Sequence, residues 1–240
     1  RRPLPAPSQL ASEDDQWILS RLQHTIETVT DALERFRFHE AADAVYDFTW
    51  HEVCDWYLEL AKGTPGQPPE ELVGARTVLA HVLSMSLRLL HPVMPFLTEE
   101  LWTTVRPTGD EGSLARASWP LVEQRYINRE AERRVAQLQA ITKEVREIRR
   151  EFVIEAGKRP TIFVNTRSQQ EAGRLRQGLQ RFQRLAEMEI GDVGVDVRRP
   201  AGSIPVPVDH MELYGSVGQV VELAKVRARL PKQIASFEQQ

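Results

Sequence analysis

The chain has 240 residues, of which 41% are hydrophobic and 27% are charged, and its formal net charge is −3. This composition suits one large domain or two smaller ones with a folded core, and it excludes a wholly disordered chain. The apolar runs are short, so we expect neither a membrane span nor a leader peptide. The single cysteine, Cys54, excludes an internal disulfide framework and a multi-cysteine zinc site, and it fits a reducing cytoplasmic compartment.

The charge is unevenly distributed along the chain. Residues 1–110 hold nine Lys and Arg against seventeen Asp and Glu, a difference of −8. Residues 129–159 hold nine against six, a difference of +3. A non-specific nucleic-acid binder usually has a broad basic footprint, which the first half lacks. Any contact of the first half with RNA must therefore be local and specific, or must rely on basic surface elsewhere.

The first half is expected to form a helical bundle. Residues 1–11 are Pro-rich and should form an extended lead-in, after which Ser12 offers a helix N-cap followed by three acidic residues. Apolar residues then recur at helical spacing up to Phe36, which predicts the first helix. Further helices are expected over 38–61, 70–90 and 95–105, with a loop over 64–69.

The second half is expected to be a smaller α+β module. After an irregular stretch over 106–127, apolar residues at spacings of three and four predict a long helix over 128–152. Strands are predicted over 161–166, 193–198 and 210–217, with a helix over 170–188. The last residues place apolar side chains in a short coiled-coil-like seam from Leu223 to Phe237, although Pro231 lies inside it.

The stretch "HPVMPFLTEELW" (91–102) turns the chain between two predicted helices. Pro92 ends one helix, because the residue before a proline disfavours α geometry, and Pro95 suits the first position of the next. We expect the apolar residues of this corner to fill the interior of the bundle and to make no contact with RNA: Val93, Met94, Phe96, Leu97, Leu101 and Trp102.

The sequence contains no recognisable catalytic constellation. Gly-rich phosphate loops and the nucleophile elbow of hydrolases are absent. His51 and Cys54 lie three residues apart and could be metal ligands or a Cys–His pair, but a metal site needs three or four ligands and no others cluster nearby, so core and boundary positions are favoured. Glu99 and Glu100 could form an acid–base pair, but acids are common in the first turn of a helix.

Two stretches resemble bacterial valyl-tRNA synthetases, which are class I enzymes. "RFHEAADAVYDFTWHEVCDWYLELAK" (37–62) is similar to the second helix of their anticodon-binding bundle, and "RLLHPVMPFLTEELW" (88–102) to the turn between its third and fourth helices. The second pattern also occurs, in variant form, in related synthetases for isoleucine, leucine and methionine, whereas "CDWYLEL" (54–60) points to the valine enzyme. Segments such as "EVREIRREFVIEAGKRP" (144–160) extend the resemblance, which is thin over 161–215.

The resemblance implies the tRNA-binding portion of a valine–tRNA ligase, either as part of a longer enzyme or as a free-standing relative. The implied fold is mainly α, divided into the lead-in (1–11), the bundle (12–124), a long helix with a small α+β module (125–218), and the start of a coiled-coil arm (219–240). The partner would be valine-accepting tRNA. Aminoacylation and editing would occur in other domains of the same polypeptide, which would hold ATP and Mg, so this segment would have no catalytic residue, metal or cofactor. A monomer is expected.

Anticodon bases are single-stranded and are read by stacking and by hydrogen bonds to their edges. The candidates for this role surround the junction of the first two helices: Arg35, Arg37, Phe38, His39 and Asp43. Arg37 could stack on a base or bind a phosphate, Phe38 could stack or instead belong to the core, and Asp43 could accept from a base amine. Tyr46 and Trp50 are expected to be core or rim residues rather than stacking surfaces.

Candidates for contact with the tRNA backbone lie on the later helices. They are Arg146, Arg149, Arg150, Lys158 and Arg159, together with Lys225 and Arg229. The alternative for the first group is a solvated face balanced by glutamates at helical spacing. A different class of function also stays open, since the acidic first half would suit a helical scaffold that docks protein partners without reading RNA.

Overall fold

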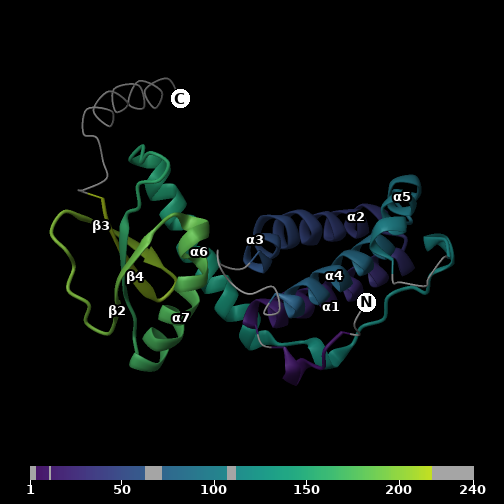
Figure 1. The fold of residues 1–240 in the computed structure, drawn as a ribbon, viewed down its shortest axis with the longest axis horizontal. Coiled ribbons are helices and arrows are strands. Elements are labelled where there is room, and N and C mark those ends of the chain that lie inside the picture. The colour runs from purple at the N-terminus through teal and green to yellow at the C-terminus, as the bar shows by residue number, and fades with distance from the viewer. Residues whose placement is uncertain (1–3, 11, 63–71, 107–111, 218–240) are drawn as a thin grey trace. The chain divides into compact units, whose positions relative to one another are not determined.

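The computed structural model describes residues 4–10, 12–62, 72–106 and 112–217, and the chain divides into two compact units, 1–133 and 134–240 (Figure 1). The first unit is a bundle of helices, and the second is a four-stranded sheet with helices packed on it. The fold is mainly α with a small mixed sheet, as the sequence predicted. The expected coiled-coil arm over 219–240 lies outside the described residues.

α1 (Glu13–Glu34) begins where the sequence predicted. The Ser12 side chain accepts a hydrogen bond from the Asp14 backbone N–H at 3.1 Å, which caps the first turn. The predicted apolar stripe is buried from Ile18 to Val29. The lead-in before it contains a short 3-10 turn, η1 (Pro7–Gln9), and its Pro5 carbonyl accepts from the Tyr126 hydroxyl at 3.1 Å. The lead-in is therefore held against the bundle at Pro5.

The predicted helix over 38–61 is continuous but not uniform. α2 (Phe38–Asp47) passes into a π-helical segment, η2 (Phe48–Tyr57), and then into α3 (Leu58–Ala61). Tyr57 is fully buried near the end of this segment, and its hydroxyl donates to the Asp15 carboxylate of α1 at 2.5 Å. Burial raises the pKa of Asp15, while this hydrogen bond acts in the opposite direction. The pair anchors one end of the segment to α1.

α4 (Val73–Leu90) and α5 (Pro95–Val105) meet at the predicted corner. α4 is the only helix among the described residues whose length and composition would also suit a membrane span. It packs instead against α1, α2, α3 and α5 as a central helix of the bundle, with Val78, Val82 and Leu89 buried. The connection to α6 (Arg129–Glu151) contains two 3-10 turns, η3 (Leu114–Arg116) and η4 (Gln124–Tyr126).

The prediction that the corner fills the bundle interior is wrong for five of its six apolar residues. Only Trp102 is buried, in a cluster with Leu87 and Leu114. Thr98, one turn earlier, is also buried, and its hydroxyl oxygen is hydrogen-bonded to His91 Nδ1 at 2.8 Å. α5 therefore covers the bundle with its Thr98–Trp102 face alone. The remaining apolar side chains are exposed: Val93, Met94, Phe96, Leu97 and Leu101.

The second unit contains the rest of α6 (Arg129–Glu151), α7 (Gln169–Ala186) and a mixed sheet of order β2-β1-β4-β3. The strands are β1 (Thr161–Asn165), β2 (Glu189–Gly194), β3 (Ser203–Val208) and β4 (Met211–Ser216). β1 pairs in parallel with β2, through the crossover helix α7, and antiparallel with β4.

The helices pack closely in this unit because glycines face them. A Cβ atom added at Gly178 of α7 would lie 2.6 Å from Leu138 Cδ1 of α6, and one added at Gly215 of β4 would lie 2.9 Å from Ile148 Cδ1. These contacts place α6 against both α7 and the sheet. The predicted apolar stripe of α6 is buried accordingly from Ala131 to Ile148.

Two strand predictions need correction. The strand predicted over 193–198 is β2 at 189–194, because the chain bends at Val195 and Asp196 and leaves the sheet. β3 was not predicted, because Pro205 and Pro207 remove two backbone donors and argue against a strand. It forms as an edge strand, paired only with β4, where the prolines are tolerated.

Candidate nucleic-acid interface

The junction of α1 and α2 is a tight turn with an unusual residue at its centre. The Arg37 N–H donates to the Ala32 carbonyl at 2.8 Å and the Phe36 N–H to the Leu33 carbonyl at 3.0 Å, the double hydrogen bond of a Schellman motif. Phe36, which follows the C-cap residue Arg35 in this motif, has φ 58°, a left-handed conformation that glycine usually provides. A bulky side chain in this conformation is strained by about 1–2 kcal/mol. Strain of this kind is concentrated at functional sites.

The turn presents two aromatic rings to solvent. Phe36 is 78% exposed and Phe38 is 62% exposed, so Phe38 does not belong to the core. Their ring centroids are 6.2 Å apart and their planes meet at 82°, an edge-to-face pair. Two adjacent exposed phenylalanines are apolar surface that a partner can cover, and each ring face can stack on a planar ligand.

The flanking arginines share one carboxylate. Arg35 Nε lies 2.8 Å from Asp31 Oδ1, and Arg37 Nη2 lies 2.6 Å from Asp31 Oδ2. Arg37 also reaches Glu40 Oε2 at 2.8 Å. Ion pairs as exposed as these stabilise the fold by about 0–1 kcal/mol each. Both guanidinium groups are therefore positioned beside the aromatic pair and can exchange their carboxylates for a phosphate or base at little cost in stability. His39 and Asp43 are exposed on the first turns of α2.

A second aromatic pair follows on the same helical segment. Tyr46 and Trp50 were expected in the core or at its rim, but both are exposed, and their rings stack with centroids 6.2 Å apart and planes only 6° from parallel. His51 packs edge-on against Tyr46 and lies 3.2 Å from Asp55. His51 and Cys54 are exposed rather than the core and boundary residues expected from sequence. Within the described ranges, no cluster of three or more potential metal ligands occurs.

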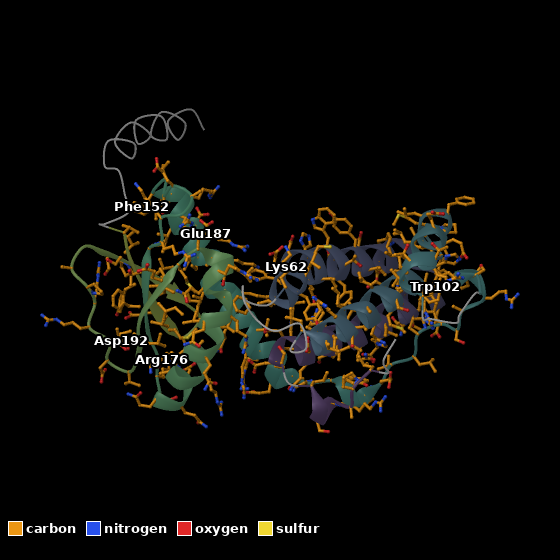
Figure 2. All side chains as sticks on the ribbon, in the orientation of Figure 1. Lys62, Trp102, Phe152, Arg176, Glu187 and Asp192 are labelled. Atoms are coloured by element: carbon orange, nitrogen blue, oxygen red, sulfur yellow. The ribbon has the colours of Figure 1, made fainter. Side chains whose placement is uncertain are left out.

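α5 lies at the same end of the bundle as the α1–α2 junction (Figure 1). Its Phe96 is 91% exposed, beside the exposed Val93, Met94, Leu97 and Leu101. The opposite face is anchored: Trp102 Nε1 donates to the Gly112 carbonyl at 3.2 Å, and the Arg88 guanidinium lies 5.3 Å from the Trp102 ring centroid (Figure 2). We call the junction rings Phe36 and Phe38, with these five residues, the exposed apolar end of the bundle.

Glu99 holds the segment that follows α5. Its Oε1 accepts from the Leu114 backbone N–H at 3.0 Å, at the start of η3. Burial raises the pKa of Glu99, but hydrogen bonds from the Ser113 side chain and from the backbone of Leu114 and Ala115 outweigh it, so the pKa lies below its ordinary value. Glu99 is therefore a structural carboxylate, and the acid–base pairing with Glu100 is not needed to explain it.

The predicted backbone-contacting residues of the second unit have different surroundings. Arg149 is only 12% exposed and donates to the carbonyl oxygens of Lys158, Glu187 and Glu155, and it pairs with the Glu187 carboxylate. Arg146 donates to the Leu185 carbonyl at 3.0 Å. These two arginines hold the end of α7, and Arg149 in particular points into its own unit.

The other predicted contacts are on the surface. Arg150 is 72% exposed and pairs with Glu147 at 2.6 Å, an ion pair of the kind that the balanced-face alternative described. Lys158, which follows α6, pairs with Glu155 at 3.4 Å. Arg159 is exposed at the entry to β1. Lys225 and Arg229 lie outside the described residues.

The family described as "Anticodon-binding domain of tRNA ligase" matches residues 15–164, which include all but the first residues of the bundle and the whole of the exposed apolar end. The chain belongs to this family. The matched region ends inside β1, so α7 and the three later strands of the anticodon-binding chain lie beyond it.

Comparison with curated proteins gives a consistent result. The chain is 36% identical over 221 residues to a valine–tRNA ligase of Fervidobacterium nodosum and 36% identical over 220 residues to that of Thermotoga maritima, covering 92% of this chain and 24% of each relative. The enzyme of Halalkalibacterium halodurans is 33% identical over 218 residues, covering 90% of this chain and 24% of the relative. The chain thus spans about a quarter of the length of these relatives.

Sequence reasoning found the junction of this anticodon-binding domain but missed much of its exposed apolar end. The sequence pattern places Phe36 last in the apolar stripe of the first helix, although it follows the last turn of α1. On α5, apolar residues occur on several sides of a short helix, which cannot all be buried on one bundle. That excess of apolar residues is the signal that could have identified the exposed face of α5.

Proposed function

We propose that this chain is the anticodon-reading part of a valine–tRNA ligase and binds valine-accepting tRNA. The observation that carries the proposal is the strained turn at Phe36, where two exposed phenylalanines alternate with two arginines over residues 35–38. The family match and the names of the relatives support it. The acidic bundle is compatible with RNA because the recognition surface is local and aromatic rather than broadly basic.

In this proposal the exposed apolar end receives splayed anticodon bases. Phe38 stacks on one base, and stacking is worth about 1–3 kcal/mol per base. Arg35 and Arg37 release the carboxylates of Asp31 and Glu40. Their guanidinium groups then contact a phosphate or stack on a base. Asp43, one turn along α2, accepts from an exocyclic amine. The α5 residues, led by Phe96, extend the apolar surface for neighbouring bases, whereas the sequence led us to expect no contact with RNA at this corner.

The remaining steps belong to the rest of the polypeptide in this proposal. Other domains join valine to tRNA with ATP and Mg and hydrolyse mischarged threonine, since an apolar pocket rejects a threonine isostere poorly. The segment itself holds no cofactor, and the enzyme is a cytoplasmic monomer. The role of this segment is to position the tRNA for both reactions.

The proposal is tested by fluorescence titration of the chain with valine tRNA and with the same tRNA carrying a different anticodon. Replacing the anticodon is expected to weaken binding by about 1–3 kcal/mol for each lost base contact. Equal affinity for both tRNAs would overturn anticodon reading. Measurements at several salt concentrations separate this effect from backbone contacts, which do not depend on the anticodon.

A second candidate function is favoured by one observation. The exposed α5 surface is apolar enough to dock a protein or another domain without any RNA. In that case, substituting Phe96 with Ser would abolish association with the protein partner, and no salt-dependent binding of tRNA would be measured even at low salt. Binding of tRNA that weakens after Phe96→Ser would instead favour the first proposal.

A further inference from the structure

The solvent face of α7 carries a continuous stripe of glutamine and arginine. The stripe has spacings of four, three, four and three residues, so its members lie on one side of the helix. The opposite side packs into the unit with Leu175, Leu179 and Phe182 buried. Four stripe residues are exposed and Arg181 is partly buried. The α7 stripe consists of Gln170, Arg174, Gln177, Arg181 and Arg184.

The charge balance of α7 differs from that of α6. α7 has four arginines, five glutamines and a single acid in 18 residues, whereas α6 has seven basic and five acidic residues in 23. Three acids on or near α7 contact residues outside the stripe. His210 Nε2 lies 2.5 Å from Glu171 Oε1, Asp192 lies 3.5 Å from Arg176, and Glu187 pairs with Arg149 (Figure 2). Arg176 also donates to the Val193 carbonyl at 2.6 Å, so it ties α7 to β2 and is not part of the stripe.

The chemistry of the stripe identifies the class of ligand. The large exposed hydrophobic side chains of the described residues all fall between 36 and 121, so none lies on this unit. The described part of α7 therefore offers no exposed apolar surface to a lipid bilayer or to an apolar protein face. Arginine forks and glutamine amides suit an anionic ligand rich in acceptor oxygens. From Arg174 to Arg184 the helix rises about 15 Å, a length over which a nucleic-acid duplex presents several phosphates.

We propose that the α7 stripe binds the phosphate backbone of an RNA helix. The inference rests on the proposed function, in which the RNA is tRNA, and extends it to a part of the chain that the family match does not include. The α7 stripe contributes affinity that does not depend on sequence, while the exposed apolar end of the bundle supplies discrimination between anticodons.

The test compares two charge-matched double variants of the chain. The first, Arg174→Gln with Arg184→Gln, removes two positive charges from the stripe. The second, Arg125→Gln with Arg133→Gln, removes two exposed arginines from the first unit, each of which has a glutamate partner three or fewer residues away. Dissociation constants for valine tRNA and for an anticodon-swapped tRNA are measured between about 50 and 200 mM salt. Thermal melting checks that each variant is folded.

The stripe variant is expected to bind both tRNAs roughly tenfold more weakly than the control variant at low salt. The slope of log K against log salt should decrease in magnitude by about 1–2. The ratio of the two affinities should stay unchanged. Affinity and slope equal to those of the control would overturn the inference, even if the wild-type chain reads the anticodon. Equal wild-type affinity for both tRNAs, with a loss in the stripe variant, would overturn anticodon reading and leave the stripe standing.

Discussion

Phe36 and Glu187 occupy equivalent positions after α1 and α7, but the contacts that surround them differ. Both have left-handed backbone conformations, with φ 58° and 48°, and both lie inside the same pair of turn hydrogen bonds. Glu187 is held by Arg149, which contacts its carbonyl and its carboxylate. Phe36 has no such clamp, and its ring projects into solvent. The same strained turn is thus held in place by side-chain contacts in the second unit, whereas in the first unit it exposes an aromatic ring to solvent.

The largest expected effect comes from removing the clamp. Arg149→Met keeps the aliphatic stem but loses the bonds to three carbonyl groups and one carboxylate, and should destabilise the second unit by roughly 2–4 kcal/mol. Chemical denaturation monitored by hydrogen exchange in α7 measures this. The matched control is the neighbouring Arg150→Met, whose exposed pair with Glu147 should cost less than about 1 kcal/mol. Equal losses in the two variants would mean that the clamp contributes nothing beyond an ordinary surface arginine.

A smaller effect is expected in binding at the other turn. Phe38→Ala should weaken binding of valine tRNA by about 1–3 kcal/mol and reduce the discrimination against a swapped anticodon, because one stacking surface is lost. Unfolding should change little, since the ring is mostly exposed. Titration of both tRNAs provides the measurement, and Leu121→Ala, which removes an exposed side chain that is not part of the proposed site, is the control. Unchanged discrimination in Phe38→Ala would remove Phe38 from the reading site.

Glycine substitution compares the two turns directly. Phe36→Gly should raise the free energy of unfolding by about 1 kcal/mol, because glycine adopts the left-handed conformation without strain, while binding of tRNA weakens. Glu187→Gly should raise the free energy of unfolding by less, because the relief of backbone strain is offset by the lost ion pair with Arg149. Thermal denaturation of both variants tests this ordering. A gain at Glu187 larger than at Phe36 would show that the clamp does not stabilise its turn.

The smallest effect concerns Glu99, which holds the η3 turn of the bundle as Arg149 holds the end of α7. Its folded pKa is lowered, so its carboxylate contributes stability that is present above the ordinary pKa of glutamate, near 4.5, and is lost as pH falls through the folded value. Glu99→Gln should therefore lower the melting temperature slightly at pH 7 and converge with the wild type in acid. A difference that grows toward low pH would reverse the assignment.

The helices were predictable where local signals agreed. Ser12 capped α1 and Pro95 began α5 as their side-chain chemistry requires, and the stripe of α6 was buried as its spacing indicated. The position of β2 was predicted too late in the chain because "VGVDVR" alternates like a strand, whereas β2 begins at Glu189 and includes Gly191 and Asp192, which have low strand propensity. These two residues lie at the register shift between the pairs Ile162–Ile190 and Val164–Val193, so the pairing on either side of them holds the strand together. Tertiary pairing of this kind is invisible to local pattern.

The candidate site was predicted in its position and only partly in its composition. Arg35, Arg37 and Phe38 surround an exposed turn, as the junction of two helices suggests. The left-handed conformation of Phe36 has no sequence signature, because glycine or asparagine is expected there. The exposure of α5 depends on which side the bundle covers, and spacing alone does not give that choice. For Arg149 and Arg150, adjacent in sequence and alike in chemistry, only the packing of α7 separates the buried clamp from the surface pair.

The prolines of β3 affect whether the sheets of two molecules can pair along this edge. Val208 and Met211 pair at the tight turn between β3 and β4, so Val206 and Ile204 also point their N–H groups toward β4. Pro205 and Pro207 then lie at the alternate positions, whose backbone faces the free edge. Most of the donors that an incoming strand would need are missing from that edge. Growth of the sheet by edge-to-edge pairing, the first step of many aggregation processes, is thereby blocked at β3.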